Sequence, residues 1–160
     1  IGCDPTNEQA VQKIYDLKRR ADSKAMLLLT DSMAKVQAYV TDVPDVVWDL
    51  VECAEKPLTI IYPQGRNLAT NLMAQDGSVG IRITNEAFSK QLCMRFKKPI
   101  VSTSANVSGQ PTPAFFDEIS EEIKAGVDYI VQARQDDREK KQPSSIIKFE
   151  KNGTFAIIRE

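Results

Sequence analysis

Two groups of residues in this sequence have side chains suited to holding an anion. The first is basic: Lys18 and Arg20, one residue apart, follow a stretch with helical spacing, and Lys24 comes shortly after them. The second is the run Ser102-Thr103-Ser104-Ala105-Asn106, in which hydroxyl and amide side chains directly follow an apolar stretch. Cations neutralise phosphate or carboxylate, and small side chains let backbone N–H groups approach it. The sequence therefore indicates an anion site, although helix-end cations and Ser or Asn turns are also common without any ligand.

Three more positions place a basic or hydroxyl side chain beside apolar residues. Arg82 lies between Ile81 and Ile83, Ser144 precedes a β-rich stretch, and Arg159 ends another. Alternation along a strand also fits an Arg82 that faces solvent, and Arg159 also fits a frayed terminal cation. Each of these positions is therefore a weaker candidate for binding an anion than the two groups above.

The composition excludes several classes of chemistry. The 160 residues contain no histidine, which rules out Ser-His-Asp and Cys-His nucleophiles and every imidazole base or metal ligand. Lys and Arg number 21 against 22 Asp and Glu, so the net charge of -1 gives no global excess to attract nucleic acid. The three cysteines are too far apart for a CxxC motif, and neither a P-loop nor a GxGxxG motif is present. No set of carboxylates has metal-ligand spacing, so no metal site is predicted.

Alternating helical and strand patterns predict an α/β fold. The periodicity predicts helices over 7–19, 31–40, 44–53, 85–97 and 112–126. Thr6 and Gln9 have capping-box spacing at the first of these helices, and Asn85 is expected to cap the fourth. Strands are predicted over 25–29, 58–62, 79–84, 100–103, 128–132, 144–149 and 154–159, with a hairpin between the last two. The expected fold is a single-domain twisted mixed β-sheet with helices packed on it.

Taken in order, the candidate residues resemble a known family. The order is Lys18-x-Arg20 after a capped helix, Arg82 in a strand, the run 102–109, then Pro143-Ser144-Ser145 and a near-terminal Arg159. This combination resembles the YrdC-like threonylcarbamoyl-adenylate synthases over essentially the whole chain, and the opening Gly-Cys-Asp-Pro at 2–5 fits as well. The resemblance implies the YrdC-like, RibB-like twisted open sheet. It also implies one domain over 1–160 that lacks the family's N-terminal strand-helix segment.

The resemblance implies a nucleotidyltransferase. Such an enzyme joins L-threonine, bicarbonate or CO2, and ATP into threonylcarbamoyl-AMP, releases pyrophosphate, and supplies the t6A modification of tRNA. ATP is then a substrate, Mg²⁺ is expected through its phosphates, and the expected location is cytoplasmic with no membrane contact. Downstream partners would be tRNA and the proteins that transfer the unstable intermediate.

By matching positions, the resemblance also implies roles for individual residues. The positions that would bind ATP are Lys18, Arg20, Thr103, Ser104, Asn106, Ser144 and Arg159. Those that would bind threonine are Arg82, with Lys24 and Ser102 as lesser candidates. Lys18 and Arg20 would be the catalytic cations, and both are expected at a surface-accessible helix end.

Two other functions remain open on the sequence alone. One is a module that binds double-stranded RNA or tRNA without catalysis, against which the net charge of -1 argues because phosphate binding needs several basic contacts on one face. The other is a carbamoyl or adenylyl transfer domain that acts on a different amine. Dependence of the reaction on threonine would separate this alternative from the synthase.

Overall fold

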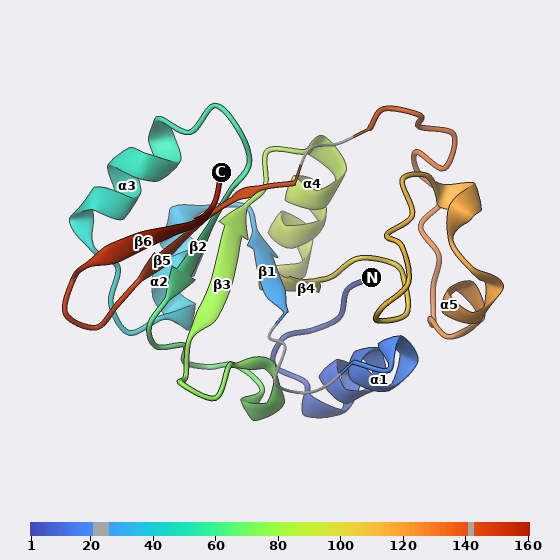
Figure 1. Cartoon of the computed structure of the whole chain (residues 1–160), viewed down its shortest axis with the longest axis horizontal. Coiled ribbons are helices and arrows are strands. Elements are labelled where there is room, and N and C mark those ends of the chain that lie inside the picture. The colour runs from blue at the N-terminus through green and yellow to red at the C-terminus, as the bar shows by residue number, and fades with distance from the viewer. Residues whose placement is uncertain (21–25, 141–142) are drawn as a thin grey trace.

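The protein is a mixed six-stranded sheet with helices packed on it, as the sequence predicts. The computed structural model describes residues 1–20, 26–140 and 143–160. Within them the sheet order is β4-β1-β3-β2-β5-β6, with β1 parallel to β3, β2 parallel to β5, and the other neighbours antiparallel (Figure 1). The strands are β1 (Leu27–Thr30), β2 (Leu58–Tyr62), β3 (Val79–Ile83), β4 (Ile100–Ser102), β5 (Ser145–Phe149) and β6 (Phe155–Arg159).

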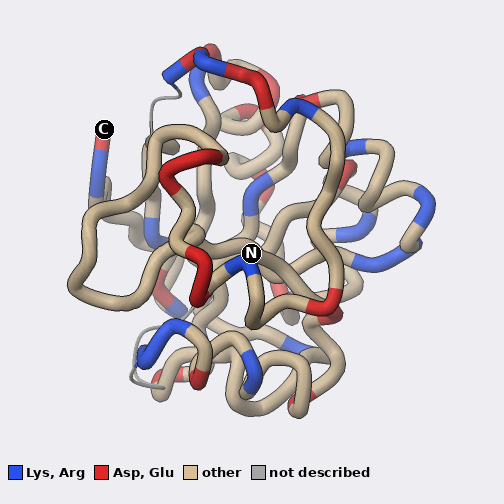
Figure 2. Tube along the Cα trace, turned by 90° about the vertical axis from the view of Figure 1, so that its right-hand side faces the viewer, with Lys and Arg blue, Asp and Glu red and all other residues tan. Residues whose placement is uncertain are grey.

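Five helices and two 3-10 turns accompany the sheet in the described residues. The helices are α1 (Glu8–Lys18), α2 (Met33–Tyr39), α3 (Asp45–Glu52), α4 (Ala87–Phe96) and α5 (Glu121–Ala125), with 3-10 turns at η1 (Thr70–Leu72) and η2 (Phe116–Glu118). Helices α2 and α4 pack beside β1, α1 packs on η1, and β6 and α5 lie at opposite ends of the molecule (Figure 1). Basic and acidic residues are interspersed along the chain on the side that carries α5 (Figure 2). Among the described helices, none is both long and apolar enough to cross a bilayer.

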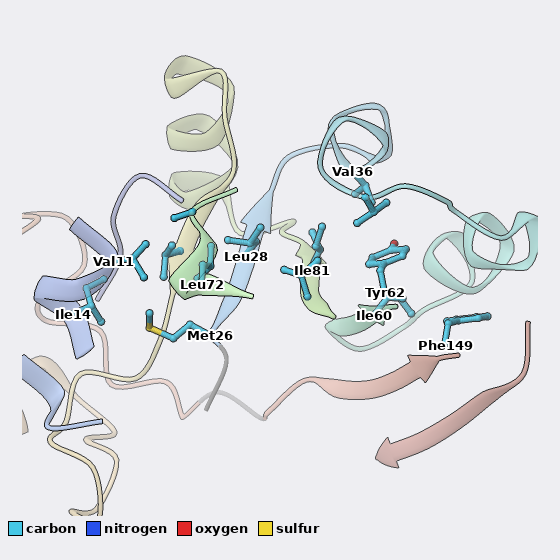
Figure 3. Packing of buried hydrophobic residues seen from close by; sticks show 14 of the residues in the cluster. Val11, Ile14, Met26, Leu28, Val36, Ile60, Tyr62, Leu72, Ile81 and Phe149 are labelled. Atoms are coloured by element: carbon cyan, nitrogen blue, oxygen red, sulfur yellow. The ribbon is translucent and has the colours of Figure 1, made fainter. Parts of the chain in front are cut away.

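One face of the sheet forms the core. Val101, Leu28, Ile81 and Ile60 are paired in register across four neighbouring strands, and all are buried. Residues paired across strands project to the same side, so this row packs as a unit against the apolar side chains of the helices (Figure 3). Burial of these branched aliphatic side chains fixes the strand register, because a shift of one residue would expose them.

The opposite face carries several polar residues among apolar ones such as Leu27, Leu29 and Ile146. We call it the polar face and define it by Ser102, Gly80, Arg82, Thr59 and Arg159. Register places the first two in the row of Leu27 and the other three in the row of Leu29. Strand alternation therefore puts candidate side chains from β4, β3 and β6 on the same side of one sheet.

The helix caps differ by one residue from those expected. Asn7, not Thr6, caps α1: its side chain accepts a hydrogen bond from the Ala10 N–H at 3.1 Å, while the Thr6 hydroxyl bonds Asp4 at 2.7 Å. Glu86, not Asn85, caps α4. A carboxylate at the start of a helix also interacts favourably with the macrodipole.

Two expected elements are wrong, and both lie between β4 and β5. The helix predicted over 112–126 is reduced to η2 and the five-residue α5, because Phe115 is extended and the Glu118 side chain accepts the Ala114 N–H at 2.7 Å. The strand predicted over 128–132 does not form, and Tyr129 there is 75% exposed. The β4 edge that a further strand could join is already bonded to residues 1–3, through the Val101 and Thr103 N–H groups. Gly2 permits this approach, since a Cβ there would lie 2.4 Å from the Val101 carbonyl oxygen.

Candidate functional site

Thr59, Ser144 and Arg159 form a hydrogen-bonded cluster at the polar face, and Arg82 lies beside it. Thr59 and Arg82 are directly paired between β2 and β3. The Thr59 hydroxyl lies 2.9 Å from the Ser144 hydroxyl, and both residues are 3% exposed. Arg159 donates from Nε and Nη2 to the Ser144 carbonyl oxygen at 2.8 and 2.6 Å, and from Nη2 to the Ser144 hydroxyl at 3.3 Å. The structure thus brings together three residues that the sequence only suggested separately: Arg82, Ser144 and Arg159.

Arg82 carries a positive charge that the protein does not compensate. It is half-buried, and it has no hydrogen-bond or ion-pair partner among the described residues. Burial lowers the pKa of its guanidinium, and repulsion from Arg159 lowers that pKa further. Two guanidiniums that repel each other with no carboxylate between them form a place where an anion would be stabilised.

Lys18 lies at the other end of the site and is buried rather than surface-accessible. It is 1% exposed, and its ammonium donates to the carbonyl oxygens of Ser104 at 2.5 Å and Asn106 at 2.6 Å. Its own carbonyl oxygen accepts the Ser108 N–H at 2.8 Å. Burial lowers the pKa of Lys18, as does the nearby charge of Arg20. The expectation of an accessible Lys18 is therefore wrong, because the lysine stem turns inward along the apolar side of α1 to reach the loop after β4.

The loop after β4 has several backbone donors without an acceptor among the described residues. Among the described residues, no acceptor faces the N–H groups of Ser104, Ala105, Asn106 or Val107, whereas two carbonyls of this loop are bound by Lys18. The Asn106 amide nitrogen donates to the carbonyls of Val107 and Gln110, and its buried oxygen has no partner. A run of unpaired N–H groups beside an ammonium is an arrangement that binds phosphate oxygens.

The remaining candidates are distributed between these two ends. Ser102 pairs with Leu27 on the polar face, and the Thr103 backbone bonds Ile1 through both its N–H and its carbonyl. Arg20 follows the left-handed residue that ends α1 and lies near enough to Lys18 to affect its pKa. The expected contribution of Lys24 lies outside the described residues.

The two ends of the site lie within reach of one extended substrate. Ser102 and Arg82 are two strands and two residues apart on the same face, which corresponds to roughly 12 Å between their Cα atoms at standard strand spacing. Leu27 and Leu29 of β1 lie on the same face between these two strands, and Gly80, two residues before Arg82, adds no side chain there. In the described part of the chain, no group of three or more Asp, Glu, Cys or His residues is placed to hold a metal ion.

Thr59 is a member of the cluster that sequence reasoning missed. It lies in the apolar run Leu-Thr-Ile-Ile-Tyr, where threonine is an ordinary β-branched strand residue. Most buried hydroxyl groups have a hydrogen-bond partner, so a threonine in an apolar strand could have suggested one.

The fold and the polar face define a twisted α/β sheet with an uncompensated cationic site. The protein-family model of Sua5, YciO and YrdC, described as "Telomere recombination", matches residues 1–160. The chain belongs to this family.

Curated relatives share about a third of their residues with this chain. Threonylcarbamoyl-AMP synthase of Pseudoalteromonas translucida is 34% identical over 134 residues, which are 82% of this chain and 72% of the relative. The protein of the same name from Vibrio parahaemolyticus is 30% identical over 91% of this chain and 80% of its own.

Solved structures show the same fold at lower identity. E. coli YciO matches with a TM-score of 0.81 and 20% identity over 99% of this chain and 76% of its own. P. abyssi Sua5, solved in complex with L-threonine, matches with a TM-score of 0.80 and 20% identity over 92% of this chain. The chain spans only 43% of that Sua5 chain and between 66% and 80% of the first three curated relatives.

Proposed function

We propose that this chain is a threonylcarbamoyl-AMP synthase, which condenses L-threonine, bicarbonate or CO2, and ATP into threonylcarbamoyl-AMP and pyrophosphate. The observation that carries this proposal is the uncompensated charge at the site. Lys18, Arg82 and Arg159 have no carboxylate partner among the described residues, and unpaired N–H groups of the loop 104–107 accompany them. The names of the curated relatives support the same activity.

The reaction suits a site built from cations and backbone donors. The threonine amine adds to CO2 and loses a proton to give a carbamate, whose oxygen attacks the α-phosphorus of ATP. The bond from that phosphorus to the bridging oxygen of pyrophosphate breaks, and negative charge accumulates on the leaving phosphates. Catalysis then consists of holding two anions together and stabilising this charge, which needs no histidine.

Each end of the site has a proposed role. Lys18 and Arg20, with the N–H groups and side chains at 103–106, would hold the triphosphate. Arg82 would face the threonine carboxylate, with Ser102 and Lys24 as lesser contributors. Ser144 and Arg159 would hold the nucleotide at the opposite end of the polar face.

The proposal extends to a metal and to downstream partners. Because the described residues offer no cluster of metal ligands, Mg²⁺ would reach the site on the phosphates of ATP and lower their repulsion of the carbamate. The product would pass to proteins that transfer the threonylcarbamoyl group to tRNA for t6A formation.

Pyrophosphate release tests the function directly. We expect release from ATP only when L-threonine and bicarbonate are both present, measured on a preparation of known intact mass. Replacing threonine by serine or glycine at equal concentration is the control for the amine. Release that ignores the amine would favour carbamoyl or adenylyl transfer to another substrate, and steeply salt-dependent RNA binding without release would favour the RNA-binding module.

A further inference from the structure

The hydroxyl pair of Thr59 and Ser144 has a spare proton. Each hydroxyl carries one proton, and the 2.9 Å bond between the two oxygens uses one of them. Arg159 has only donors, so its 3.3 Å contact with the Ser144 hydroxyl uses a lone pair and not a proton. No other acceptor for this pair is present among the described residues, so one O–H of the pair has no protein acceptor there.

This spare donor lies between two arginines that lack an anion. Thr59 is paired with Arg82 on β3, and Ser144 holds the Arg159 guanidinium through three hydrogen bonds. Every residue of β6 is exposed, so the contact with Ser144 is what fixes the long Arg159 side chain at the edge of the sheet. Thr59 in turn fixes the Ser144 side chain, since both are 3% exposed and bonded to each other.

We propose that Thr59 is a positioning residue of this site. Its hydroxyl orients Ser144 and, through Ser144, Arg159. The spare proton of the pair is donated to a substrate oxyanion bound next to it, at Arg82 or at Arg159. The inference deepens the proposed function and rests on it for the identity of the substrates. The oxyanion is a phosphate of ATP or the carboxylate of threonine, and separate binding measurements distinguish these sources.

Thr30 shows that a buried strand threonine need not have such a role. It lies on β1 and is fully buried, and its hydroxyl has no hydrogen-bond partner. It belongs to the core face, because it is paired with Ile83 and not with a residue of the polar face. Thr30→Val therefore makes the same chemical change as Thr59→Val, at the same burial, away from the proposed site.

Calorimetric binding of ATP and of L-threonine, each without the other, is the test. We expect Thr59→Val to weaken the affinity for one of these substrates by roughly tenfold or more. This is the effect expected from the loss of a hydrogen bond to a charged group. Thr59→Ser keeps the hydroxyl and should bind within about twofold of the wild type, and Thr30→Val should bind as the wild type does. Thermal unfolding of each variant checks that it is folded.

Three results would overturn the inference. They are wild-type affinity of folded Thr59→Val for both substrates, a loss in Thr59→Ser as large as in Thr59→Val, or an equal loss in Thr30→Val. If Thr59→Val does not fold, Ser144→Ala removes the same hydrogen bond from the other side and must weaken the affinity for ATP or for L-threonine. In a double-mutant cycle the two hydroxyls should act as one unit, so additive losses would also count against the proposal.

Binding and pyrophosphate release distinguish the role of Thr59 from the proposed function. Wild-type protein that binds ATP and threonine but releases no pyrophosphate contradicts the function and leaves the binding comparison valid. Normal binding by Thr59→Val in a protein that does release pyrophosphate contradicts only the role of Thr59.

Discussion

The basic residues of the polar face and those of the segment 133–140 differ in what surrounds their charge. Arg134 bonds Glu86 at 2.8 Å and also contacts Asp137, and Arg138 bonds Asp117 at 2.6 Å. On the polar face, Arg159 instead bonds the carbonyl and hydroxyl of Ser144, and the Arg82 side chain has no partner among the described residues. Basic side chains of the same protein therefore have their charge balanced by carboxylates in one region and unbalanced in the other.

The difference distinguishes charges that form ion pairs within the fold from charges that are suited to binding an anionic ligand. Ion pairs such as those of Arg134 are partly exposed, and water and salt screen them, so each contributes little to stability. An arginine that is half-buried beside another arginine is unfavourable for the fold by itself, because burial and repulsion both oppose its charge. Substitution should therefore affect activity at the polar face and only stability at 133–140.

The largest effect is expected from Lys18→Met. This change removes the ammonium and leaves the carbonyls of Ser104 and Asn106 without their donor, so we expect the loop to lose its position and kcat/KM for pyrophosphate release to fall at least about 100-fold. Unfolding free energy should fall by about 1–3 kcal/mol, because two carbonyl oxygens lose a buried donor.

Lys13→Met is the matched control for this change. Lys13 is on the same helix, but its side chain is 73% exposed and its contact with Asp128 is 3.9 Å long. Neither activity nor stability should change measurably. Activity of Lys18→Met close to that of the wild type would remove the loop after β4 from the site.

Arg82→Gln should reduce activity without reducing stability. We expect kcat/KM to fall about tenfold to 100-fold, because a charge-assisted contact to a substrate anion is lost. The midpoint of thermal unfolding should stay equal or rise, because the variant removes a half-buried charge that repels Arg159. A variant that is less stable than the wild type yet equally active would show that Arg82 serves the fold and not the site.

The sequence was informative where a local pattern determines the structure. The β-rich composition of residues 58–62 identified a strand, and Asn152-Gly153 identified the final hairpin, because both signals depend on neighbouring residues. Residues 112–132 were mispredicted because their helical and strand propensities are overridden by the Glu118 contact with Ala114 and by the lack of a free edge at β4.

The residues of the candidate site also fall into those that the sequence could identify and those that it could not. Residue type and order led to Arg82, Ser144 and Arg159, which the sheet brings to one face. The inward direction of Lys18 and the partnership of Thr59 with Ser144 could not be predicted, because both depend on contacts between residues more than 80 positions apart.

The smallest effect is expected where a carboxylate balances an arginine. Burial would raise the pKa of Glu86, but hydrogen bonds from Ser89, Phe88 and Arg134 outweigh it and lower this pKa to about 2. Because the pKa is lower in the folded state than its ordinary value of 4.5, the stabilisation by the ionised carboxylate is complete above pH 4.5 and is lost as the pH falls toward 2. Glu86→Gln should therefore cost at most about 1 kcal/mol at pH 7, since the pair with Arg134 is partly exposed.

The dependence on pH distinguishes the ionised Glu86 carboxylate, which caps α4 and pairs with Arg134, from a packing contact. Unfolding by urea at pH 7, 4.5 and 3 should show the difference between Glu86→Gln and the wild type shrinking below pH 4.5, with activity at pH 7 unchanged. Glu121→Gln is the control, because that carboxylate is 88% exposed and should contribute little at any of these pH values. A difference that persists undiminished at pH 3 would mean that Glu86 contributes through packing and not through its charge. Reduced activity at pH 7 would instead place Arg134 among the residues that act on the substrate, and the contrast between balanced and unbalanced cations would no longer separate structure from function.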